Sequence, residues 1–96
     1  MKTIRSFPEA EIEFDHALSA SPDPLAFRRD VDLALDGICR GVITHRNIGR
    51  SRLRECVLAR LPYLIVYLDE DNEIVVVAFA HKKRRRGYWK SRLKPS

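Results

Sequence analysis

The chain has 96 residues, of which 45% are hydrophobic and 32% charged, the balance of one small globular domain spanning residues 1–96. The net charge is +5, and no apolar run approaches the roughly 20 residues that cross a bilayer, so no membrane contact is expected. The opening stretch MKTIRSFPEAEIEF turns acidic without an apolar segment, which argues against a secretory signal and predicts a cytoplasmic protein.

The charge is unevenly distributed along the chain. Residues 1–38 hold eight acidic and four basic side chains, whereas residues 39–96 hold five acidic and fourteen basic ones. This polarity predicts a polyanionic partner for the basic half, either nucleic acid or an acidic protein segment. Cys39 and Cys56 lack the spacing of metal ligands and the three histidines lie far apart, so neither a metal nor a cofactor is expected.

The first half of the chain predicts a short strand and two helices. Residues 2–7 are a candidate strand, and Pro8 ends it and suits the first turn of a helix over 8–19. The break SASPDP separates this helix from a second one, which Gly41 is expected to end. The apolar stripes are Ala10, Phe14, Ala17 and Leu18 in the first helix, and Phe27, Val31, Ala34, Leu35 and Ile38 in the second.

The second half predicts three strands after a loop at 42–51. Residues 52–60 alternate in polarity, and residues 63–70 and 73–81 are rich in β-branched and aromatic side chains around the turn DEDN. The order is therefore β-α-α-β-β-β, an α/β (α+β) fold in which a helical hairpin packs on a small antiparallel sheet. In the last strand, simple alternation places Val75, Val77 and Phe79 on one face and Val76, Ala78 and Ala80 on the other.

Four stretches, in this order, resemble the RelE/ParE superfamily of type II toxin–antitoxin toxins, also described as plasmid stabilisation proteins. They are FPEAEIEF, FRRDVDLALDGI, LPYLIVYLDEDNEIVVVAFAH and HKKRRRGYW, which together cover nearly the whole chain. The resemblance implies a growth-inhibiting toxin with a cognate antitoxin that wraps an extended or helical segment around it. It leaves two targets open: DNA gyrase, bound by ParE-like toxins, and mRNA on the ribosome, cut by RelE-like toxins.

If the chain is an enzyme, the resemblance implies a metal-independent endoribonuclease. Such chemistry needs a base, an acid and cations near the scissile phosphate. Arg52, Arg54 and Arg60 would form a cationic row if they share one face of a strand over 52–60. The candidate catalytic residues are Arg52, Arg54, Arg60, His81, Arg84, Arg85 and Tyr88.

Two departures from the nuclease branch favour binding over cleavage. Where that branch commonly carries an arginine after the aromatic of PYLIVY, this chain has Leu64, which cannot stabilise a phosphorane. Trp89 stands where the nuclease branch is expected to have its terminal tyrosine, and an indole has no acidic proton to give. We therefore expect a ParE-like toxin that binds its target, with mRNA cleavage as the alternative.

The basic residues have structural interpretations as well. His81 can be a hydrogen-bonded residue at a strand end, and Tyr88 with Trp89 can anchor the tail on the sheet. A partner is expected to cover residues 50–60 and 82–94 with acidic groups and a few apolar anchors. The residues expected to contact the target or the antitoxin are Arg52, Arg54, Arg60, Lys82, Lys83, Arg84, Arg85, Arg86 and Trp89.

Overall fold

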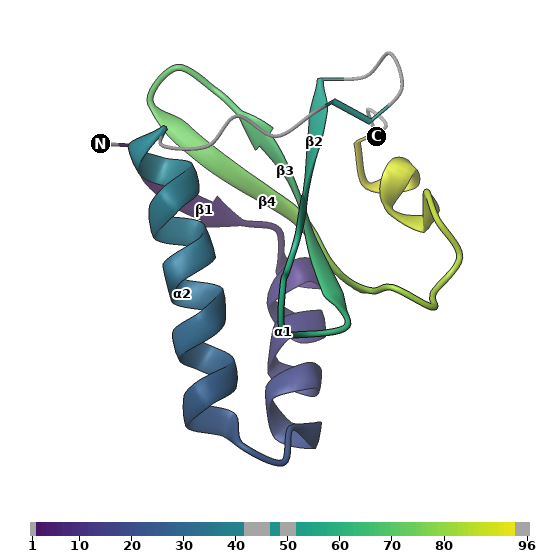
Figure 1. Ribbon diagram of the computed structural model, residues 1–96. Helices are drawn as coiled ribbons and strands as arrows, with labels where there is room; N and C mark the ends of the chain where they lie inside the picture. Colours follow the sequence, from purple (N-terminus) through teal and green to yellow (C-terminus); the bar gives the residue numbers. More distant parts are fainter. Residues whose placement is uncertain (1, 42–46, 49–51, 94–96) are drawn as a thin grey trace.

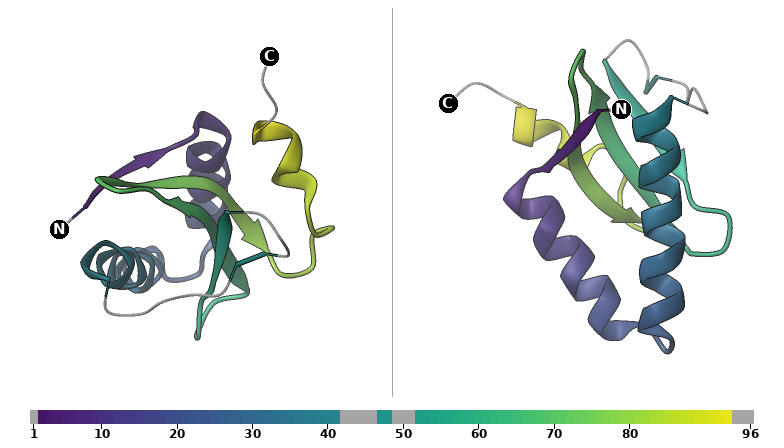
Figure 2. Two further views of the ribbon diagram at one scale, coloured as in Figure 1. Left: turned by 90° about the horizontal axis from the view of Figure 1, so that it is seen from above. Right: turned by 90° about the vertical axis from the view of Figure 1, so that its left-hand side faces the viewer.

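The computed structural model describes residues 2–41, 47–48 and 52–93, which fold around one four-stranded sheet (Figure 1). Two helices cover one face of this sheet and the C-terminal segment, residues 82–93, covers the other, as the two views of Figure 2 show. Most of the predicted loop at 42–51 lies outside the described residues. The elements are β1 (Thr3–Ser6), α1 (Pro8–Ala20), α2 (Pro24–Arg40), β2 (Leu53–Val57), β3 (Tyr63–Asp69), β4 (Glu73–His81) and the 3₁₀ helix η1 (Tyr88–Leu93).

The helix boundaries follow from local sequence signals, as predicted. Pro8 opens α1. The Asp23 side chain caps α2 by accepting a hydrogen bond from the Ala26 N–H at 3.2 Å, and Pro24 occupies the first position. Gly41 ends α2 with a φ of 69°, a left-handed conformation that glycine adopts without strain.

The sheet is mixed, with the strand order β1-β4-β3-β2. β2, β3 and β4 form the predicted antiparallel meander, but β1 pairs with β4 in parallel, so the expectation of a wholly antiparallel sheet is wrong on this point. The connection from β1 to β4 passes through two helices and two strands, which is long enough to allow parallel pairing. β1 reaches only as far as Val76, which leaves the rest of β4 without a neighbouring strand on that side.

A β-bulge in β4 changes which side chains face the helices. Val66 pairs with Ala78 but Tyr67 pairs with Val76, so Val77 is an extra residue in the ladder. Val77 and Ala78 therefore both pack on the face opposite the helices, and Phe79 turns to the helix side. The predicted grouping of Val77 with Phe79 on one face is wrong for this reason.

Each face of the sheet carries its own hydrophobic cluster. The helix side is the larger, and the rings of Phe14 and Phe79 meet edge to face there with centroids 5.5 Å apart. Phe27 and Tyr67 are buried on this side, and the pKa of Tyr67 is raised to about 12 by burial first of all. The smaller cluster on the other face consists of Leu53, Leu64, Val66, Val77, Ala78, Ala80 and Trp89.

Candidate functional site

The last strand ends at His81, as predicted, and a tight turn follows it. The Nδ1 atom of His81 accepts a hydrogen bond from the Lys83 N–H at 3.1 Å, and the Arg84 N–H donates to the His81 carbonyl at 3.0 Å. The imidazole also lies edge-on to the Tyr63 ring, with centroids 5.0 Å apart. His81 therefore organises the turn that starts the basic segment, which matches its structural interpretation.

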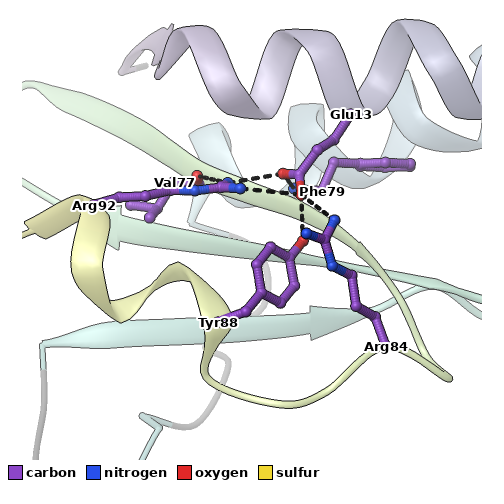
Figure 3. Close-up of polar contacts among 6 residues, drawn as sticks. All are labelled: Glu13, Val77, Phe79, Arg84, Tyr88 and Arg92. Carbon is purple, nitrogen blue, oxygen red and sulfur yellow. Dashed lines mark hydrogen bonds and ion pairs between the residues drawn. The ribbon is translucent and has the colours of Figure 1, made fainter.

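Glu13 of α1 is the residue that holds the C-terminal segment on the sheet (Figure 3). Its carboxylate accepts hydrogen bonds from the guanidinium of Arg92 at 2.8 Å, from Arg84 at 3.2 Å, and from the hydroxyl of Tyr88. The side chains of Glu13 and Arg92 are each only 12% exposed. A half-buried acid thus joins α1 to three positions of a segment more than 70 residues later in the sequence.

The same network closes the part of β4 that the short β1 leaves uncovered. The Phe79 N–H donates to Glu13 at 3.2 Å, and Arg92 donates to the Val77 carbonyl at 2.9 Å. Backbone groups at a sheet edge need partners when they are buried. Side chains from α1 and η1 provide these partners in place of a longer first strand.

The protonation states of this network follow from its contacts. Burial raises the pKa of Glu13, but hydrogen bonds from Arg92, Tyr88 and the Phe79 N–H outweigh it, and the net pKa lies below the usual 4.5. Burial, followed by the hydrogen bond to Glu13, raises the pKa of Tyr88 to about 12. The Glu13 hydrogen bond raises the pKa of Arg92 further. At neutral pH the network therefore holds a carboxylate, two guanidinium ions and a neutral phenol.

Trp89 also anchors the segment, through apolar contacts with the face of the sheet opposite the helices. It is 2% exposed and belongs to the cluster on the face opposite the helices, which also contains Leu64. The predicted packing of Tyr88 and Trp89 onto the sheet is confirmed, although the 3₁₀ helix that carries them was not predicted. Trp89 was also expected to contact the target or the antitoxin, but in this position no partner reaches it unless the segment moves.

The predicted cationic row on one strand does not form. β2 spans only Leu53–Val57, so Arg52 precedes it and Arg60 lies in the bend that follows it. Arg52 pairs with Glu70 beyond the end of β3, and only Arg54 belongs to the strand. The run of alternating polarity suggested a longer strand, whereas Pro62 and the turn before Tyr63 end the pairing earlier.

The structure brings only some of the candidate catalytic residues together. His81 and Arg84 line a shallow hollow of about 260 Å³ beside Glu13, and the guanidinium of Arg84 lies 3.7 Å from the centre of the Tyr88 ring. Arg60 lines a different hollow, between α2 and β2, and Arg85 lines a third one near η1. No cluster of potential metal ligands occurs among the described residues, and none of their helices is long and apolar enough to span a membrane.

The comparisons with known proteins agree with this fold. The family model described as "ParE toxin of type II toxin-antitoxin system, parDE" matches residues 9–86. The chain belongs to the ParE toxin family. A search of curated proteins finds no match.

Among solved structures, this ParE-family chain resembles one titled "Chromosomal ParDE TA system from P. aeruginosa". The TM-score is 0.66 with 13% sequence identity, and the match covers 84% of this chain and 96% of that chain. At this identity the likeness concerns the fold alone. Fold and family confirm the resemblance to the RelE/ParE superfamily that the sequence motifs indicated.

Sequence reasoning missed Glu13 and Arg92. The signal for Glu13 was present, because it lies three residues after Ala10 and four before Ala17, on the apolar stripe of α1. A carboxylate on a buried face of a helix requires a cation to compensate its charge. The C-terminal part of the chain, which is rich in lysine and arginine, could supply that cation. Arg92 had no comparable signal, since it is one of many cations in the segment.

Proposed function

We propose that this ParE-family chain is the toxin of a toxin–antitoxin pair, that a cognate antitoxin neutralises it, and that it inhibits growth by binding DNA gyrase without cleaving RNA. The observation that carries the choice of binding over cleavage is the Glu13 network. It engages Tyr88 and Arg84, two of the candidate catalytic residues, which RNA cleavage would need in a free, reactive form.

The chemistry of cleavage fits this network poorly. A general acid works best with a pKa near the working pH, but the pKa of Tyr88 is about 12 and its proton is directed to Glu13. Cations stabilise a phosphorane when they are free to contact it, whereas Arg84 and Arg92 are both ion-paired with Glu13. Leu64 is buried in the core beneath the segment and offers no charge at all.

The antitoxin is proposed to bind along α2 and β2. A groove of about 470 Å³ lies between these elements, and its walls include Leu33 and Val57, which are 65% and 53% exposed. β2 is an edge strand, and the Leu58 N–H donates to the Tyr63 carbonyl at 3.1 Å, so the backbone groups of Val57 point to the free edge. An extended antitoxin segment can pair with this edge and place an apolar side chain in the groove.

Arg60 at the rim of the groove gives the antitoxin a cation to recognise, as the sequence predicted for this residue. Arg54 forms an antiparallel β-bridge with Asn47 on the same edge, and among the described residues no strand pairs with that edge at the end of β2 nearest Arg60. An antitoxin segment with an acidic residue beside an apolar anchor would fit both features.

Two assays with the purified toxin test the choice of target. In the first, gyrase supercoils a relaxed plasmid with increasing amounts of toxin; in the second, ribosomes carrying a defined mRNA are incubated with the same amounts. We expect supercoiling to be inhibited and the transcript to stay intact, with antitoxin reversing the inhibition. Intact supercoiling together with cut transcript would contradict the proposal and support the RelE-like alternative.

A further inference from the structure

The cations of the C-terminal segment form two sets with different roles. Arg84, Arg86 and Arg92 pair with the half-buried or buried carboxylates of Glu13 and Glu55, and so hold the segment in place. Within residues 82–93, the remaining cations have no acidic partner among the described residues. These are Lys82, Lys83, Arg85 and Lys90, all of them exposed.

Two members of the second set, Arg85 and Lys90, line a polar hollow. A space of about 400 Å³ is lined by Arg85, Arg86, Gly87, Tyr88 and Lys90, which we call the basic hollow. Gly87 has a φ of 82°, and this turn lets the Lys90 side chain fold back beside it, with its Cε atom 3.3 Å from where a Cβ of residue 87 would lie. Lys82 and Lys83 are exposed in the turn that leads into it.

We propose that the basic hollow, with Lys82 and Lys83, binds the phosphate backbone of duplex DNA. Glu55 compensates Arg86, so Arg85 and Lys90 supply the free charge inside the hollow and the two lysines extend it. Phosphate contacts need only cations at suitable positions, and they carry no sequence information.

The composition of the surface distinguishes DNA from an acidic protein. Protein–protein interfaces generally bury an apolar centre within a polar rim. The aromatic residues that could provide such a centre are already used, because Trp89 is buried and the Tyr88 ring packs against Arg84.

The same occupied rings favour a duplex over a single strand. Proteins that bind single strands stack bases on exposed aromatic faces. In this chain the guanidinium carbons of Arg84 and Arg92 lie 3.7 Å and 5.1 Å from the centre of the Tyr88 ring, and Trp89 contacts it edge-on. What remains available is charge without a stacking surface, which suits the outside of a double helix.

This site goes beyond gyrase binding, since it predicts that the toxin contacts DNA without gyrase. The test measures fluorescence anisotropy of a short labelled duplex titrated with the wild-type toxin at several salt concentrations. Each phosphate contact contributes a slope of about −0.9 in a plot of log affinity against log salt, so four contacts weaken binding about 150-fold over a fourfold rise in salt.

The variant Arg85→Gln/Lys90→Gln removes two of these cations, and the same rise in salt should then weaken binding only about 12-fold. The control Arg28→Gln/Arg29→Gln removes two exposed cations from α2 and should behave like the wild type. Circular dichroism and urea unfolding of each variant verify that folding is retained.

Several outcomes would overturn the proposal: no binding of duplex at low salt, equal salt slopes for both double variants, tighter binding of a single strand of the same sequence, or equally effective competition by polyglutamate of matched charge. Inhibition of gyrase by a toxin that fails to bind DNA would refute this inference alone and leave the proposed function standing.

Discussion

At the scale of single residues, Glu13 holds the basic C-terminal segment against the sheet by binding Arg84, Tyr88 and Arg92. Without a carboxylate on the buried stripe of α1, Arg84 and Arg92 would repel each other, and the segment would lose the ion pairs and hydrogen bonds that join it to the first helix. Its carboxylate also accepts the Phe79 N–H, so one side chain supports both the tail and the edge of β4. A basic run that resembles a solvated tail is thereby folded against the sheet.

Replacing Glu13 with glutamine should therefore destabilise the protein by about 2–4 kcal/mol, because the largely buried Arg92 loses its compensating charge and the exposed Arg84 loses its ion pair. The measurement is urea unfolding followed by fluorescence of Trp89, the single tryptophan, whose emission reports directly on the docked segment. Glu73→Gln is the matched control. It removes an exposed ion pair with Arg5 and should change stability by less than about 1 kcal/mol. Equal effects of the two changes would refute the role assigned to Glu13.

The lowered pKa of Glu13 predicts how stability depends on pH. The folded state holds the ionised carboxylate more firmly than the unfolded state, whose pKa is near the usual 4.5. The contribution is therefore fully present above that value and is lost as the pH falls through the lower, folded pKa. Urea midpoints measured from pH 7 to about pH 3 should fall less steeply for Glu13→Gln than for the wild type. Parallel curves would show that other carboxylates dominate the acid sensitivity.

At the scale of elements, the sequence predicted the two helices, the meander and their order, because caps and apolar periods are local signals. It did not predict the parallel pairing of β1, since pairing direction depends on where a strand docks after folding. The bulge at Val77 was equally hidden, because every residue from Ile74 to Ala80 is apolar and an inserted residue leaves no break in polarity.

The site was predictable only in part, because the sequence reveals local patterns but not contacts between distant residues. The closing position of His81 and the anchoring role of Trp89 follow from local pattern, whereas the partners of the cations depend on contacts across the whole chain. Arg52 and Arg60 failed to share a strand with Arg54 because alternation in sequence continues beyond the residues that actually pair.

The groove between α2 and β2 yields a prediction with a matched control. Leu33→Asp places a charge in the groove and should weaken antitoxin binding at least about tenfold, because a buried leucine contributes about 1.5–3 kcal/mol. Ile12→Asp makes the same kind of change on α1, where Ile12 is 67% exposed, and should leave affinity unchanged. Isothermal titration calorimetry with the purified antitoxin compares the two. Loss of affinity in the Ile12 variant instead would move the binding site to α1.

At the scale of the whole molecule, the polarised charge directs how partners approach. Acidic side chains dominate residues 1–38, which include both helices up to Ile38, and basic ones dominate residues 39–60 and the C-terminal segment after β4. A field of this kind steers an acidic partner to the basic side before any short-range contact forms.

Salt should therefore slow association of toxin and antitoxin more than it speeds dissociation, since steering acts over distances that ions screen. Stopped-flow or surface-based kinetics at increasing salt would measure both rates on the same sample. Equal salt sensitivity of the two rates would count against long-range steering and favour contacts that form only in the bound complex.

The central claim is that this toxin binds its target and breaks no bond, with His81 serving the turn after β4 rather than chemistry. The most direct measurement incubates ribosomes carrying a defined mRNA with the wild-type toxin and with His81→Ala, and maps transcript ends by primer extension. We expect no new transcript ends with either protein, at toxin concentrations that inhibit gyrase. Cleavage by the wild type that disappears in His81→Ala would contradict it.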